Sequence, residues 1–336
     1  MKKNEDFSLL CLLFCIHSKS GHEGKIRKFI WNWVKHNVPE AKIECDKPGN
    51  IYVTKGKSDT YPCIVAHLDQ VQERHSNDFI AYEAEDIIIG FSPKHKEQQG
   101  LGADDKVGIW VGLKCLQKFD CLKLCFFVEE EVGCRGSEQA DMDFFKDCRF
   151  VIEPDRREAN DLITVIGWTS LCSEEFLKDI GYQKYGYKET DGAMTDIETL
   201  KDNGLAISCI NLSCGYYKPH TDQEFVYKPA VSNCLDFVEH IIKTCKKVYP
   251  HVDDTARYER QNYYGEIYDD FYGEIYDMLT NDPSLSFGDI EARFDDFYGR
   301  HNYNKIELES AYDLAREDIL FWKDQEGKET TKVLTK

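Results

Sequence analysis

The stretch Cys63–Val71, CIVAHLDQV, decides the fold that this sequence predicts. Its apolar first half is typical of a buried strand, and the run stops on His67, with Asp69 two positions later. Residues i and i+2 of a strand point to the same side, so these two side chains can act together. Taken alone, the pair is better explained as the point where a strand leaves the core for solvent. The remainder of the sequence changes that interpretation.

Strand-like and helix-like segments alternate on both sides of this stretch. The apolar, strand-like runs are NIYVTKG (50–56), CLKLCFFVEEE (121–131), CRFVIEPD (148–155) and LAISCINLSCG (205–215). The runs with apolar residues at helical spacing are 21–38, 103–119 and 234–249. Strands that are apolar throughout are expected at the centre of a sheet covered on both faces. The sequence therefore predicts an α/β fold, a doubly wound mixed sheet flanked by helices.

The character of the chain changes after about residue 250. The hexapeptide YGEIYD begins at Tyr264 and again at Tyr272, within an acidic segment rich in tyrosine. Apolar residues then recur at helical spacing as far as Phe297. We expect two parts, an α/β domain over 1–250 and a helical C-terminal appendage over 251–336.

Composition excludes several classes of protein. A formal net charge of -19 argues against binding to nucleic acid or to an anionic membrane, both of which require a basic surface. The fourteen cysteines are scattered and form no CxxC pair, which favours buried free thiols in a reducing cytoplasm. No segment is long enough to span a membrane, and the apolar run Leu9–Ile16 is interpreted as part of a first helix. We therefore expect a cytoplasmic protein.

Acidic and imidazole side chains follow the predicted strands at or just after their ends. They are His67, Asp69, Asp104, Asp105, Glu129, Glu130, Glu131, Glu153, Asp155 and His220. Ligands of open α/β sheets bind beyond the carboxyl ends of the strands, so these groups are expected to converge. Like charges about 4 Å apart repel by roughly 4 kcal/mol, so either some of these groups are protonated, or they point apart, or cations hold them. Three carboxylates and a hydroxide balance two divalent ions.

The ordered set HxD, GADDKxG, EExG, an aspartate after a strand and a late histidine resembles the co-catalytic dizinc metallopeptidases of clan MH. Peptidase T and its relatives are the nearest match, over about residues 5–245. The resemblance implies a doubly wound sheet with two divalent metal ions, zinc in this clan, at its carboxyl edge. It also implies that the protein hydrolyses peptide bonds of small peptides, as an aminopeptidase or a di- or tripeptidase.

Site roles follow from the resemblance. His67, Asp104, Glu131, Asp155 and His220 would bind the metals, with Asp104 bridging both ions and its peptide bond to the next residue cis. Two further residues would be catalytic. Glu130 would act as general base toward a water activated by the two metals, and Asp69 would orient the imidazole of His67.

Some assignments stay open. The sequence around Glu153 and Asp155 resembles two branches of the clan, and Asp155 is the preferred ligand. Asp196 is a candidate to receive a substrate amine or, equally, to cap the following helix. The intervals between the predicted ligands leave no room for a lid domain, so a lidless catalytic domain is expected.

The function also has alternatives. One is an amidohydrolase of the same fold that releases an acyl group from N-acyl amino acids. Another is a non-catalytic metal-binding or assembly protein that uses the appendage as its working surface. The substrate is expected to be a small peptide, and the sequence does not distinguish a monomer from a homo-oligomer.

Overall fold

The structure is a computed structural model that describes residues 6–167 and 169–252, and, further along the chain, residues 275, 278–280, 282–298, 305, 308–309, 312 and 315–316. The chain divides into two compact units, Met1–Asp253 and Asp254–Lys336.

The larger unit is built on a mixed sheet, which comprises nine strands within the described residues. Along the sheet the order is β1 (Lys42–Cys45), β2 (Ile51–Lys55), β7 (Leu122–Phe127), β3 (Tyr61–His67), β8 (Cys148–Arg156), β12 (Cys209–Ser213), β9 (Asp161–Ile166) and β10 (Thr169–Ser170). A further strand, β11 (Lys188–Gly192), pairs with β9. The central strands β7, β3, β8 and β12 are parallel to one another, so their carboxyl ends lie at one edge.

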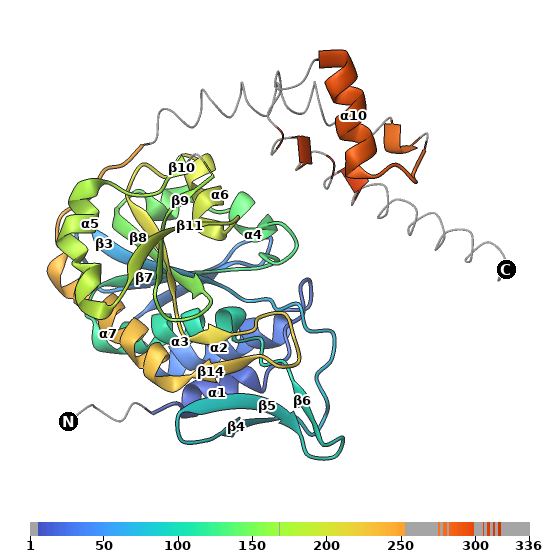
Figure 1. Cartoon of the computed structure of the whole chain (residues 1–336). Coiled ribbons are helices and arrows are strands. Elements are labelled where there is room, and N and C mark those ends of the chain that lie inside the picture. The colour runs from blue at the N-terminus through green and yellow to red at the C-terminus, as the bar shows by residue number, and fades with distance from the viewer. Residues whose placement is uncertain are drawn as a thin grey trace. The chain divides into compact units, whose positions relative to one another are not determined.

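Helices cover both faces of this sheet (Figure 1). One face packs against α1 (Ser8–Phe14), α2 (Gly24–Asn37), α3 (Ala103–Lys118), α5 (Glu174–Ile180) and α7 (Lys228–Thr244). The other packs against α6 (Asp196–Asp202) and the 3-10 turn Met142–Phe145, with α4 (Arg135–Glu138) beside α6. A second 3-10 turn, Tyr182–Tyr185, contacts α7. The predicted α/β architecture is confirmed.

Strand β3 shows why this sequence is buried on both sides. Ile64 and Ala66 belong to the apolar core under α3, whereas Cys63 and Val65 belong to the core on the opposite face. Every residue of β3 is buried, which is the reason that its sequence is apolar throughout instead of alternating. The strand ends at His67, opposite Phe127 of the parallel strand β7.

A second, five-stranded sheet was not expected from the sequence. Its strands are β13 (Tyr216–Tyr217), β14 (Phe225–Tyr227), β5 (Ile87–Ser92), β4 (Ile80–Glu83) and β6 (Glu97–Gln99). Three of them, β4 to β6, occupy the interval between His67 and Asp104. These strands are short, and β4 is largely exposed, so their sequences lack the continuous apolar pattern of the central strands.

The smaller unit contains the helix α10 (Phe287–Tyr298). Its described buried side chains form one apolar cluster, namely Ile275, Leu279, Leu285, Ile290, Phe294, Leu308, Tyr312 and Ala315. The hydroxyl of Tyr312 donates to the carbonyl of Leu285 at 2.9 Å, which ties two segments of this unit together. Nearly all of the YGEIYD repeat, from Tyr264, lies outside the described residues.

All fourteen cysteines lie within the described residues and are free thiols. Ten of them are buried, including Cys63, Cys125 and Cys209 of the central strands. Among the described residues, none of the helices combines the length and the apolar character needed to cross a bilayer.

Candidate metal centre

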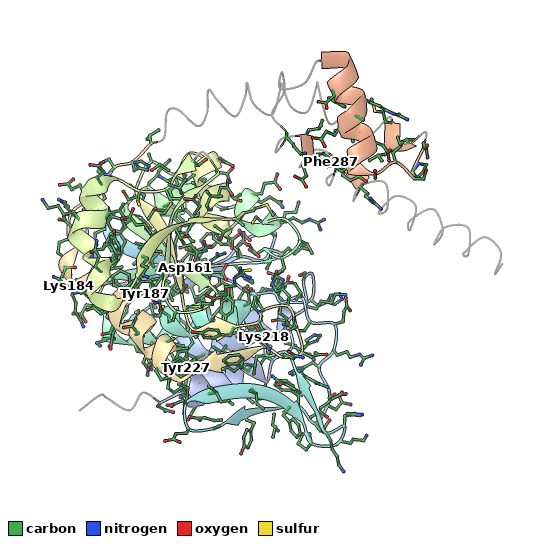
Figure 2. The ribbon with its side chains drawn as sticks, viewed as in Figure 1. Asp161, Lys184, Tyr187, Lys218, Tyr227 and Phe287 are labelled. Atoms are coloured by element: carbon green, nitrogen blue, oxygen red, sulfur yellow. The ribbon has the colours of Figure 1, made fainter. Side chains whose placement is uncertain are left out.

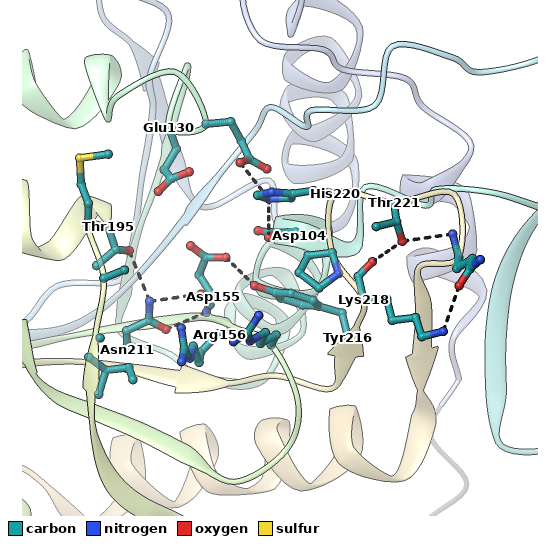
Figure 3. A pocket seen from close by; sticks show the side chains of 18 of the residues that line it. Asp104, Glu130, Asp155, Arg156, Thr195, Asn211, Tyr216, Lys218, His220 and Thr221 are labelled. Carbon is teal, nitrogen blue, oxygen red and sulfur yellow. Dashed lines mark hydrogen bonds and ion pairs between the residues drawn. The ribbon is translucent and has the colours of Figure 1, made fainter. Parts of the chain in front are cut away.

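The carboxyl edge of the central strands gathers the side chains singled out in the sequence. His67 is the last residue of β3, Asp155 lies near the end of β8, and Glu130 and Glu131 follow β7. Asp104 stands in the first turn of α3, and its peptide bond to Asp105 is cis, as predicted. Figure 3 shows Asp104, Glu130, Asp155 and His220 around a single opening.

One group of contacts surrounds the buried imidazole of His67. Its Nε2 lies 3.1 Å from Oδ1 of Asp104 and 3.6 Å from Oδ1 of Asp155. The carboxylate of Glu130 is more distant, with Oε2 at 3.8 Å from the same nitrogen. His67, Asp104 and Asp155 therefore form one triad of candidate ligand atoms.

A second triad surrounds His220, which reaches the site from the loop between β13 and β14. Its Nε2 lies 3.2 Å from Oδ2 of Asp104 and 3.0 Å from Oε2 of Glu131. The two oxygens of Asp104 thus face different histidines, and the next-nearest carboxylate is that of Asp155 at Nε2 of His67 and that of Glu131 at Nε2 of His220. This is the arrangement that a carboxylate bridging two cations requires.

Asp69 lies behind His67 and is fully buried. One carboxylate oxygen, Oδ1, is 3.4 Å from Nδ1 of His67 and accepts the backbone N–H of Glu130 at 2.9 Å. The other, Oδ2, accepts the hydroxyl of Ser20 at 2.7 Å and the N–H of Glu131 at 3.2 Å. A single carboxylate therefore lies against the imidazole and accepts two hydrogen bonds from the loop that carries the two glutamates.

The electrostatics of the site reflect the crowding of carboxylates. Burial and the charges of Asp105 and Asp104 raise the pKa of Asp155 well above its usual range. Burial likewise raises the pKa of Glu130 to about 8, with Asp196 and Asp104 adding to the shift against the opposing effect of His67. Burial and the neighbouring negative charges thus disfavour the ionised forms of Asp155 and Glu130, and a bound cation would stabilise these ionised forms.

The residues present fit divalent cations. Two imidazoles and three carboxylates are ligands that zinc and similar ions accept. Ligand atoms of His67, Asp104 and Glu131 lie within 4.8 Å of one another. In addition, Oε1 of Glu131 is buried without a hydrogen-bond partner among the described residues, which leaves it available to a cation.

Two questions left open by the sequence have structural answers. Glu153 is fully buried and accepts the hydroxyl of Thr195 at 2.6 Å, so Asp155 and not Glu153 approaches His67. Asp196 is also fully buried and accepts the hydroxyl of Ser137 at 2.5 Å. It begins α6 without capping it, so the capping prediction is wrong, and it is not among the residues that line the cavity described below.

Sequence reasoning missed Glu224. This buried carboxylate accepts the backbone N–H of Gly102 at 2.7 Å, that of Ala103 at 3.0 Å and that of Asp104 at 3.3 Å. It therefore fixes the turn that presents Asp104. In the sequence it precedes the apolar Val226 by two residues, a spacing that does not set it apart from acids at the surface.

Replacing Glu224 by glutamine is expected to destabilise this turn by about 2 kcal/mol, because an amide group would face N–H donors with one acceptor too few. The free energy of unfolding in urea measures the loss. A matched control is Gln223→Glu, which changes charge at the exposed neighbouring position. Equal stability of Glu224→Gln and the parent protein would show that the turn does not depend on this carboxylate.

A cavity of about 930 Å³ opens beside the two triads. Asp104, Glu130, Glu131, Asp155 and His220 all line it. Glu129 does not line it and is 3.9 Å from Arg135 instead. The volume is sufficient for a small-molecule ligand such as a short peptide.

No protein-family model matches this sequence, and no curated protein matches it. Solved structures do share its fold. The aminopeptidase PepT from Bacillus cereus superposes with a TM-score of 0.56 at 13% identity, over 70% of this chain and 96% of that one. A tripeptidase from Staphylococcus aureus gives 0.55 at 14% identity, over 69% and 95%. The TET1 peptidase of Pyrococcus horikoshii gives 0.51 at 13% identity, over 69% and 98%. This chain therefore has the fold of these peptidases.

Proposed function

We propose that this protein is a metal-dependent hydrolase that cleaves peptide bonds of small peptides. The observation that carries the proposal is the pair of triads that share Asp104, His67–Asp104–Asp155 and His220–Asp104–Glu131. The fold shared with an aminopeptidase and a tripeptidase supports the same reaction class.

Two divalent ions, zinc by resemblance, would be held by His67, Asp104, Asp155, Glu131 and His220. When bound, such ions supply Lewis acidity and lower the pKa of a coordinated water. Asp69 orients the imidazole of His67 through the contact at Nδ1, which leaves Nε2 directed to the site.

Glu130 is the proposed general base. Its side chain lines the cavity, and its Oε2 lies at 3.8 Å from His67, farther than the corresponding oxygens of Asp104 and Asp155. A carboxylate in this position accepts a proton from the attacking water and donates it to the leaving amine. The backbone N–H of Glu130 donates to Oδ1 of Asp69, which fixes the position of the backbone from which this side chain extends.

The substrate test compares peptides with a free amine and N-acyl amino acids. We expect the zinc-loaded protein to hydrolyse dipeptides and tripeptides, with kcat/KM for the free-amine series at least tenfold above that for N-acetyl amino acids. Amine release, followed by chromatography, measures both. The opposite preference would support the amidohydrolase, and no hydrolysis in either series, with two metals bound, would contradict an enzymatic role.

The free thiols support a reducing compartment, so we place this reaction in the cytoplasm.

A further inference from the structure

The second sheet lacks the polar side chains that a sheet normally presents to water. In β5, Ile88 is buried in the same apolar core as Val226 of β14, whereas Ile87, Ile89 and Phe91 point to the opposite side of the sheet. An antiparallel sheet with one face in water normally alternates between apolar and polar side chains. Here the outward set is apolar as well, so packing against the core does not account for it.

The strand register extends this outward set across the sheet. Residues directly opposite each other in an antiparallel pair project on the same side. Tyr82 of β4 and Phe225 of β14 both lie opposite Ile89, and the ring of Tyr217 in β13 stacks on that of Phe225 with centroids 5.0 Å apart. We call the resulting surface the outer face; it comprises Ile80, Tyr82, Ile87, Ile89, Phe91, Tyr217, Phe225 and Tyr227.

Much of the outer face is exposed. The exposed fractions are 55% for Tyr82, 40% for Ile80, 39% for Tyr227 (labelled in Figure 2) and 36% for Ile87, and the other members are partly exposed. A complete aromatic side chain has a surface of about 150 to 250 Å², so the outer face exposes on the order of 400 Å² of apolar surface. Contiguous apolar surface of this extent is often a site of interaction.

The composition of the outer face favours a second copy of this chain as its partner. None of its residues is charged, although the chain has a net charge of -19. Interfaces between transient partners resemble the average protein surface, whereas homodimer interfaces are about 65% apolar. A standard interface buries about 800 Å² per partner, of which about 500 Å² is then apolar. The outer face supplies most of that area, and the ion pair between Glu83 and Lys228 at 2.9 Å gives it a polar margin.

We propose that the outer face is the interface of a homodimer, in which the outer faces of two copies pack against each other. Sheets that pack face to face lie about 10 Å apart and interdigitate their side chains. Within the described residues β4 pairs with β5 alone, so a second copy could also add to its free edge. Edge pairing would leave the outer face in water, which favours the face-to-face arrangement. This inference is independent of the proposed function, because association requires neither metal nor hydrolysis.

Sedimentation equilibrium of the full-length protein tests the association. We expect the dimer to predominate above about 10 µM, at the weak end of the range for interfaces of this size. The contact is apolar and the two copies carry like net charges, so raising NaCl from about 0.05 M to about 0.5 M should strengthen the dimer. A protein that is monomeric at about 100 µM would overturn the proposal, as would a dimer that salt dissociates.

Lysine substitutions locate the interface. Tyr82→Lys and Tyr227→Lys each place a charge in the outer face, from strands on the two sides of β5, and each should raise the dissociation constant at least thirtyfold. Val248→Lys introduces the same charge at an exposed apolar residue outside the outer face and should leave the constant unchanged. An unchanged constant in both tyrosine variants would overturn the proposal.

A milder variant keeps the interface testable if a lysine variant fails to fold, which circular dichroism would reveal. Tyr82→Thr retains a residue that favours strands but removes the aromatic ring from the outer face. We expect it to raise the dissociation constant at least fivefold with the fold intact. Dimerisation as tight as that of the parent protein in a folded Tyr82→Thr would overturn the assignment of this face.

Discussion

Glu130→Gln is expected to lower kcat by about 100- to 10,000-fold while the protein still binds two metal ions per chain. The amide keeps the shape of the side chain but cannot accept the proton of the attacking water. Metal content is expected to persist because Glu130 is not among the five proposed ligands. Steady-state hydrolysis of a dipeptide and elemental analysis of the same sample measure the two quantities.

The adjacent Glu129 provides a matched control. Its carboxylate pairs with Arg135 at 3.9 Å and is outside the cavity, so Glu129→Gln should retain the turnover of the parent protein. An unchanged kcat in Glu130→Gln would remove the proposed base. A parallel loss of metal in that variant would instead make Glu130 a ligand.

Asp104→Asn is expected to have the second large effect, on metal binding itself. The two oxygens of Asp104 face His67 at 3.1 Å and His220 at 3.2 Å, so one amide group cannot serve both sites. We expect fewer than one metal ion per chain and a loss of hydrolysis by more than about 100-fold. Saturation of one site at a hundred times its Kd stabilises a protein by about 2.7 kcal/mol. Zinc should therefore raise the Tm of the parent protein by several degrees, but not that of Asp104→Asn.

Asp222→Asn is the control for this experiment. Asp222 is an exposed carboxylate that lines the same cavity and accepts the N–H of Gly100 at 3.4 Å. Its replacement changes the charge of the cavity by the same amount but should leave two ions bound. If Asp104→Asn also bound two ions with unchanged affinity, the bridging role would be wrong.

The central sheet was predictable because the burial of each central strand is visible in the sequence of that strand alone. A strand such as β3, buried on both faces, requires an unbroken apolar run, and the polar residue that ends such a run marks the sheet edge. The convergence of His67 and Asp155 follows from the parallel pairing of β3 with β8, and Asp104 joins them from the first turn of α3. The predicted set of residues therefore met at one place even though 153 positions separate His67 from His220.

The parts that were not predicted depend on contacts distant in sequence. Strand β5 pairs with β14, which lies more than a hundred residues further on, and β4 and β6 pair with β5. The pattern of these three strands is too short to identify them. The role of Glu224 likewise depends on contacts with residues distant in sequence. Nothing around it in the sequence distinguishes an acid that binds three backbone amides from the many acids at the surface.

The segment from β13 to β14 links the retention of metal ions to the local stability of the fold. It carries His220 at one point and Glu224 four residues later, so one short piece of chain supplies a candidate ligand and also anchors the turn that bears Asp104. Detachment of this segment would move the imidazole of His220 away from the site and, in the same event, free the turn that carries Asp104. The rate at which a bound ion dissociates should therefore follow the rate at which this segment opens locally. A ligand that holds the segment in place would slow the exchange of ions with the solvent.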